Sequence, residues 1–247
     1  MIKFDSPLRR LPPRLDRSDA LVLDGIRHAA EIATLSDRRL RETLTEIATS
    51  DDNGSEQSAG RITSAYLDAW AMVDSLDRLR ALVELVPEAP GSEGHTKVLS
   101  GKLQSIRGLR NVADHLATRI DYVVARKTPA LGYLRWLTLT DQRKGLTCVL
   151  VPGTLPEKVE FAFGNHAGHK VQYPTGRILL AAGEYEACLC DAMDVGSQMI
   201  RGLEEGLRVA VGEHGLEGRA VGADLFARGE IVFFETGDEP TTSTPRG

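Results

Sequence analysis

The sequence places Arg110, Asn111 and His115 close together, and these residue types can handle a phosphate and a proton. A guanidinium can donate two parallel hydrogen bonds to phosphate oxygens, which a lysine does less well. An imidazole exchanges a proton near neutral pH, so it can act as a general acid or base. Cleavage of RNA by its own 2′-hydroxyl needs both functions. The segment is therefore a candidate catalytic site for phosphodiester chemistry.

The segment falls on the polar face of a helix that we expect from about residue 97 to about residue 125. At about 100° per residue, the apolar side chains occupy one side of this helix and the polar ones the other. Asn111 and His115 are four residues apart and lie nearly above one another, whereas the Cβ directions of Arg110 and His115 differ by about 140°. One helix would not easily place both groups on one small molecule, so we expect a second copy of it to complete the site.

We therefore treat Arg110, His115 and Asn111 as candidate catalytic residues, and Arg107 and Arg119 as candidate substrate-binding residues. Arg110 would hold the reacting phosphate, His115 would transfer the proton, and Asn111 would orient the imidazole or the substrate. Arg107 and Arg119 would hold the flanking phosphates.

The pattern Arg110-Asn111-x-x-x-His115 resembles the motif of HEPN domains, in which a polar residue follows an arginine and a histidine comes shortly after. The resemblance covers the helical half, roughly residues 17–127, and the helix expected near 184–211 would be a further member of the bundle. It implies an antiparallel helical bundle, a homodimer with both motifs facing one cleft, and a metal-independent endoribonuclease. Many members are toxins or antiviral defence effectors. The strands expected at 133–173 depart from the compact family pattern.

A structural alternative uses the same residues without catalysis. Arg110 and Asp114 have the spacing of an ion pair within one helix, and His115 is then an ordinary surface or interface residue. The chain would in that case be a non-catalytic helical scaffold or a protein-interaction module. RNA is the partner in the first interpretation, and an antitoxin or another protein is a possible partner in both.

The distribution of charge is uneven along the chain. The formal net charge is −5, but residues 97–127 carry a local charge of +5. The overall acidity argues against a general nucleic-acid coat, and any attraction for an anionic partner would be confined to this strip. An ordinary solvent-exposed helix face would show the same local excess of positive charge without binding any anionic partner.

Two histidines and two cysteines in the C-terminal half are the types of residue that bind zinc. His166 and His169 are followed by Cys188 and Cys190, but their separation is not a usual zinc spacing. We expect a helix to begin near the cysteines, and residues two apart on a helix point in different directions. We therefore predict no metal site, and the glycine-rich stretches match no nucleotide-binding motif, so we predict no cofactor.

The elements that would position these residues can be read from periodicity and from turn signals. We expect an extended basic arm over residues 1–16, a helical bundle over 17–128, a region of strands with a further helix over 129–236, and a disordered tail over 237–247. The bundle has one long helix or two collinear ones from Ser18 to just before Ser50, a second helix ended by Pro87, and the helix at 97–125. The remaining segments are strands at 133–140, 146–151 and 231–234, a hairpin of 159–163 with 171–173 around a turn at 164–168, and a helix at 184–211.

These elements predict an α+β fold, mainly α, with an antiparallel bundle and a small antiparallel sheet in the C-terminal half. No stretch of about 18 apolar residues is available to cross a membrane. Three cysteines are too few and too unevenly placed for a disulfide framework. We therefore expect a protein of the cytoplasm that has no membrane partner. The two tryptophans, Trp70 and Trp136, are expected to be core anchors.

Overall fold

The computed structural model describes residues 1–11, 15–51, 55–87, 94–115, 129, 131–141, 144–153, 174–212 and 227–228. Within these ranges the chain is mainly helical and has a four-stranded antiparallel sheet, which confirms the expected fold class. Along the chain, the elements are a 3₁₀ turn η1 (Pro7–Arg9), then α1 (Arg17–Thr49), α2 (Glu56–Val83), α3 (His95–Lys102), α4 (Gln104–Asp114), β1 (Tyr133–Leu139), β2 (Gly145–Leu150), β3 (Thr175–Ala182), β4 (Tyr185–Cys188) and α6 (Leu189–Gly212).

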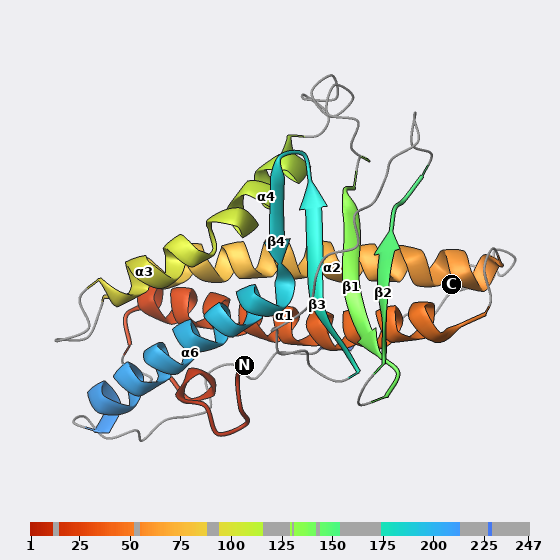
Figure 1. The fold of residues 1–247 in the computed structure, drawn as a ribbon. Coiled ribbons are helices and arrows are strands. Elements are labelled where there is room, and N and C mark those ends of the chain that lie inside the picture. The colour runs from red at the N-terminus through yellow and green to blue at the C-terminus, as the bar shows by residue number, and fades with distance from the viewer. Residues whose placement is uncertain are drawn as a thin grey trace, which may run out of the picture.

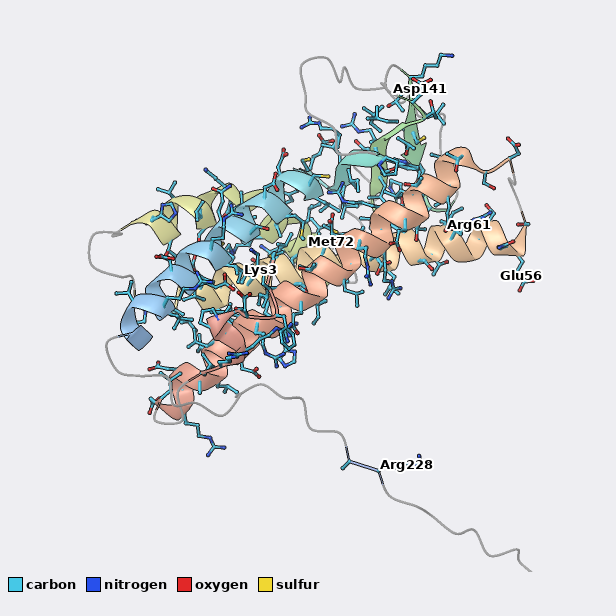
Figure 2. The ribbon with its side chains drawn as sticks, turned by 90° about the horizontal axis from the view of Figure 1, so that it is seen from below. Lys3, Glu56, Arg61, Met72, Asp141 and Arg228 are labelled. Carbon is cyan, nitrogen blue, oxygen red and sulfur yellow. The ribbon has the colours of Figure 1, made fainter. Side chains whose placement is uncertain are left out.

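The helices α1 and α2 form a long antiparallel pair against which the other elements pack (Figure 1). α1 is one unbroken helix, and it begins at Arg17, one residue before the expected start, because the Asp16 carboxylate accepts a hydrogen bond from the Ser18 N–H at 2.8 Å. Met72 of α2 is fully buried and lies toward the middle of the molecule, whereas Glu56 and Arg61 mark the start of the helix (Figure 2). The apolar faces of both helices supply much of the core.

The N-terminal segment is not the extended arm that its prolines suggested. Pro7 begins the 3₁₀ turn η1, and the Ser6 hydroxyl accepts a hydrogen bond from the Leu8 N–H. Leu8 and Leu11 are buried in the core of this same chain. Proline suits the first position of a helical turn, and two leucines gain more from burial than from exposure on an arm.

The sheet has the strand order β2-β1-β3-β4, and every neighbouring pair is antiparallel. β1 and β2 confirm the strands expected at 133–140 and 146–151. The helix expected at 184–211 begins later, at Leu189, because Tyr185–Cys188 pair with β3 as strand β4. β3 itself was not expected. Gly183, at φ 59°, forms with Glu184 the two-residue turn between these strands.

A chain of buried hydroxyl groups joins α1 to the two central strands. The Thr175 hydroxyl lies 2.7 Å from the Thr45 hydroxyl and 2.7 Å from the Thr138 hydroxyl, and the Trp136 indole N–H donates to Thr138 at 3.1 Å. Thr138 and Thr175 are almost completely buried. These contacts satisfy the polar groups that the sheet buries against α1.

Several expected features lie outside the described residues. They are the hairpin of 159–163 with 171–173 and its turn at 164–168, the strand at 231–234, and the tail at 237–247. Across the part of the chain that is described, none of the helices combines the length and the apolar character needed to span a membrane.

Candidate functional site

The helix expected from about residue 97 to about residue 125 is divided, and its part from residue 116 onward lies outside the described residues. It breaks at Leu103 into α3 and α4, and α4 ends at Asp114, so His115 follows its last turn. Leu103 leaves helical geometry with its side chain fully buried, which indicates that tertiary packing outweighs the local preference of the segment. The backbone N–H of His115 still donates to the carbonyl of Asn111 at 3.2 Å. The motif therefore lies at the C-terminal end of a short helix.

Gly108 sets how closely α4 approaches the sheet. A Cβ at this position would lie 2.3 Å from Cδ1 of Tyr185 on β4, closer than atoms can pack. Glycine is costly inside a helix, but here it lets the helix backbone lie against the tyrosine ring. This contact fixes α4, and with it Arg107 and Arg110, relative to the strands.

Gly108→Ala is therefore expected to destabilise the protein by about 1 kcal/mol, because overpacking costs about 1–3 kcal/mol and better helix propensity returns about 1 kcal/mol. In a Tyr185→Ala background the ring is gone, and the same substitution is expected to stabilise by up to about 1 kcal/mol. Urea denaturation of the four proteins of this double-mutant cycle measures both values. The same sign in the two backgrounds would contradict the proposed contact.

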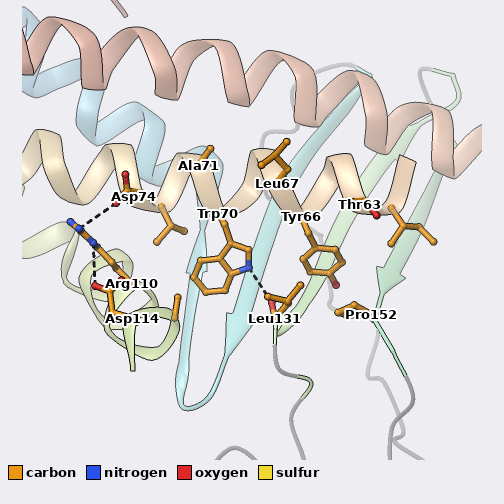
Figure 3. Close-up of a pocket in the computed structure, with 13 residues that line it drawn as sticks. Thr63, Tyr66, Leu67, Trp70, Ala71, Asp74, Arg110, Asp114, Leu131 and Pro152 are labelled. Carbon is orange, nitrogen blue, oxygen red and sulfur yellow. Dashed lines mark hydrogen bonds and ion pairs between the residues drawn. The ribbon is translucent and has the colours of Figure 1, made fainter. Parts of the chain in front are cut away.

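Arg110 is the centre of an ion-pair cluster that joins α4 to α2. Its guanidinium donates a hydrogen bond to Asp77 of α2 at 3.1 Å. It lies 3.3 Å from Asp74, also on α2, and this second contact is drawn in Figure 3. It also lies 3.5 Å from Asp114, one turn along α4, which confirms the ion-pair spacing. The Asp77 side chain is 10% exposed, whereas Asp74 and Asp114 are 44% and 58% exposed. Asp77 is therefore the firm anchor, and the other two contacts are surface pairs.

Asp77 is shared with a second arginine. Arg80 donates to Asp77 at 2.9 Å and to Glu84 at 3.1 Å, and its side chain is 11% exposed. Burial alone would lower the pKa of Arg80, but the hydrogen bond and charge of Asp77, together with Glu84, raise it. Arg80 therefore remains charged, and Asp77 holds two guanidinium groups in place.

The other candidate residues of α4 face solvent. Arg107, Asn111 and His115 are all exposed. The structure thus places three of the five sequence-predicted residues on α4 and His115 directly after its end, and it turns Arg110 toward α2. Arg119, the fifth, lies outside the described residues.

An apolar groove lies beside Arg110, with a volume of about 670 Å³. Trp70 is half-buried in it and donates its indole N–H to the carbonyl of Leu131, so it is not the fully buried anchor that we expected (Figure 3). Burial raises the pKa of Tyr66, whose hydroxyl donates to the Leu150 carbonyl at 2.7 Å. The lining residues are Ile62, Thr63, Tyr66, Leu67, Trp70, Ala71, Val73, Asp74, Arg110, Ala113, Asp114, Leu131 and Pro152.

Sequence reasoning missed Asp74 and Asp77 as partners of Arg110. Their spacing places both on one side of α2, but the sequence carries no signal that α4 lies against that side. It also missed the groove, because the groove combines residues of α2, α4 and the ends of the strands.

The zinc-type residues are partly described. Cys188 and Cys190 are half-buried free thiols at the junction of β4 and α6, whereas His166 and His169 lie outside the described residues. No group of three or more potential metal ligands gathers among the residues whose positions are given.

Comparisons of the chain with protein-family models, with curated proteins and with solved structures gave no match.

Proposed function

We propose that this chain is a HEPN-like, metal-independent endoribonuclease of the cytoplasm, with Arg110 and His115 as its catalytic residues. One observation carries the proposal. Arg110 is anchored to α2 by the nearly buried Asp77, while Asn111 and His115 meet solvent on the same helix end. An arginine positioned in advance and an exposed imidazole are the two groups that phosphodiester cleavage needs.

The proposal requires Arg110 to exchange surface carboxylates for a phosphate. Asp74 and Asp114 are about half exposed, and exposed ion pairs of this kind contribute only about 0–1 kcal/mol. A phosphate that accepts two hydrogen bonds from the guanidinium can replace them. Asp77 stays in place during this exchange and keeps the guanidinium at the surface.

The proposed active form is a homodimer. Arg110 turns toward α2 while Asn111 and His115 stay exposed, so a single α4 does not gather all three side chains around one phosphate. A second α4 would supply the missing group, with Arg107 holding a flanking phosphate. The family resemblance adds a role in a toxin–antitoxin system or in antiviral defence, where an antitoxin would be the regulatory partner.

Cleavage of a single-stranded RNA in EDTA tests the proposal. His115→Ala is expected to lower the rate at least about 100-fold, because general acid–base catalysis contributes a factor of about 10²–10⁴. His95→Ala is the matched control, since His95 is also an exposed histidine, on α3, and has no role in the site. It is expected to leave the rate unchanged.

Two outcomes would overturn the catalytic proposal. One is equal cleavage by the wild type and the His115→Ala variant, which would identify a contaminating nuclease. The other is no cleavage by either protein when both are folded and dimeric.

A second candidate function is a non-catalytic module that binds another protein. The apolar groove favours this function, because it is a surface on which another protein can dock. The three carboxylates around Arg110 favour it as well, because they already neutralise the charge of its guanidinium. A suitable partner segment would place an apolar side chain beside Trp70 and a basic side chain beside Asp74 and Asp114. A stable complex that is lost in Leu67→Glu, without any RNA cleavage, would support this function over the first.

A further inference from the structure

A second cluster of chemically capable groups lies where β4 meets α6, away from Arg110. Cys188 is the last residue of β4 and Cys190 is the second residue of α6. Within a helix, two residues at this spacing would point apart. The change from strand to helix instead places the two thiols near enough for each to shift the pKa of the other.

The surrounding elements direct further donors at Cys190. The Arg41 guanidinium of α1 donates to its Sγ at 3.3 Å, and the backbone N–H of Ile178 donates at 3.5 Å. Arg41 is itself fixed by Asp37, at 2.9 and 3.0 Å, and by the carbonyl of Thr175 at 2.7 Å. The sulfur therefore sits in a built site formed by α1, β3, β4 and the first turn of α6.

The N–H of Ile178 is available because β3 has a bulge at this point. Arg177 and Ile178 together face Trp136 of β1, and Arg177 takes a positive φ of 51°. A bulge interrupts the ladder of a sheet and redirects one backbone group. Left-handed backbone at a non-glycine residue is strained, and such strain is typical of functional sites.

The charges around the two sulfurs favour a thiolate on Cys190. The hydrogen bond from Cys188, the charge of Arg41 and the Ile178 N–H lower the pKa of Cys190 to about 6, against burial and Asp37, which raise it. The hydrogen bond to Cys190, burial and the charge of Asp191 raise the pKa of Cys188. Arg177 lies 3.7 Å from Asp191 and partly offsets this carboxylate.

We propose that Cys190 and Cys188 form a peroxide-reactive dithiol, in which Cys190 attacks a small hydroperoxide and Cys188 then closes an intramolecular disulfide. Cys190 is the nucleophile because Arg41 and Ile178 stabilise its anion. Cys188 is the resolving thiol because it is protonated and already near the Cys190 sulfur. Both residues are half-buried free thiols, so they are partly accessible to a small reagent. This inference is independent of the proposed nuclease.

The Cys190 thiolate attacks the terminal peroxide oxygen, an S–O bond forms, the O–O bond breaks, and the departing alkoxide or hydroxide takes a proton. Cysteine is oxidised by two electrons to a sulfenic acid, and the hydroperoxide is reduced to an alcohol or water. Cys188 then loses its proton and attacks the Cys190 sulfur, so that an S–S bond forms and water leaves. A small thiol restores both cysteines by exchange.

The spacing allows this disulfide. Two residues of extended chain span at most about 7 Å between Cα atoms, and disulfides join Cα atoms about 4.4–6.8 Å apart. Cys188 ends β4 and Cys190 lies in the first turn of α6, and the mutual effect of the thiols on their pKa values indicates that the side chains are near one another. When the sulfenic acid forms, the negative charge on Cys190 disappears, and the main obstacle to deprotonating Cys188 disappears with it.

The pH dependence of alkylation by iodoacetamide, followed residue by residue by mass spectrometry on the full chain, tests the first step. The rate at Cys190 is expected to be half-maximal near pH 6 and flat above neutrality. Cys148 is the internal control, because burial raises its pKa and its rate should still rise at pH 9. Arg41→Gln is expected to move the Cys190 midpoint up by at least about one pH unit, and Arg41→Lys by less.

Treatment with hydrogen peroxide tests the second step. The wild type and Cys148→Ser are expected to form the Cys188–Cys190 disulfide, and Cys188→Ser is expected to accumulate a sulfenic acid at Cys190 that dimedone traps. A Cys190 midpoint at or above pH 8 in the wild type would overturn the proposal, whatever the stability of the Arg41 variants. Peroxide treatment that leaves Cys188 and Cys190 reduced, or oxidises Cys148 at an equal rate, would overturn it as well.

Discussion

Replacement of Asp77 by alanine is expected to lower the free energy of unfolding by about 3–5 kcal/mol. Asp77 accepts hydrogen bonds from Arg80 and Arg110, and its side chain is only 10% exposed. Without it, Arg80 would keep Glu84 as its partner, but its guanidinium would remain inside the protein with less compensation. Removing one partner of a nearly buried pair costs more than the pair contributed, because the remaining charge is poorly solvated.

Urea denaturation of the wild type and of the Asp77→Ala variant measures this effect. Asp74→Ala is the matched control, because Asp74 also contacts Arg110 from α2 but is 44% exposed. Its removal is expected to cost no more than about 1 kcal/mol. Equal costs for the two substitutions would mean that Asp77 acts as an ordinary surface residue.

The same pair of variants bears on the nuclease proposal. Asp74→Ala removes a competitor for the Arg110 guanidinium, so RNA affinity is expected to stay the same or rise. Asp77→Ala removes the anchor that positions Arg110, so cleavage is expected to fall even at temperatures where the variant is folded.

Trp136→Ala is expected to destabilise the protein by about 3–5 kcal/mol, because the side chain is 1% exposed and lies in the core. The substitution also removes the indole N–H that donates to Thr138 within the buried chain of hydroxyls. The cavity and the lost hydrogen-bond donor both lower the free energy of unfolding.

Trp70→Ala is the control for this substitution, because Trp70 is only half-buried at the groove. Its removal is expected to lower the free energy of unfolding by less than half as much as the removal of Trp136. The chain has two tryptophans, so each variant keeps a single fluorescent reporter. The Trp70→Ala variant keeps Trp136, which is shielded from water, and the Trp136→Ala variant keeps the half-buried Trp70. The fluorescence of Trp70→Ala should therefore have its emission maximum at the shorter wavelength. A larger loss of stability for Trp70→Ala would contradict the burial of the two side chains.

The helices α1 and α2 and the strands β1 and β2 could be predicted because their patterns are local. The apolar residues of α1 recur with the period of a helix, and they are the residues that the structure buries, among them Leu23, Ile26 and Leu40. In β1, buried and half-buried residues alternate as expected of a strand. β3 was not expected, because its residues are buried or half-buried along the whole strand and a bulge at Arg177 and Ile178 interrupts its pairing. Its pairing with β1 and β4 therefore could not be recognised.

For the candidate site, the sequence by itself determined that Arg107, Arg110 and Asn111 share a helix and that Arg110 can pair with Asp114, because both follow from the helical period. Tertiary structure alone decided that the helix ends at Asp114 and that Arg110 turns to Asp74 and Asp77. Tertiary structure alone also decided that the Arg41 guanidinium donates to the Cys190 sulfur and that Cys188 lies near it. These contacts join residues far apart along the chain or across a change from strand to helix, and their partners are set by packing between elements, which no local period records.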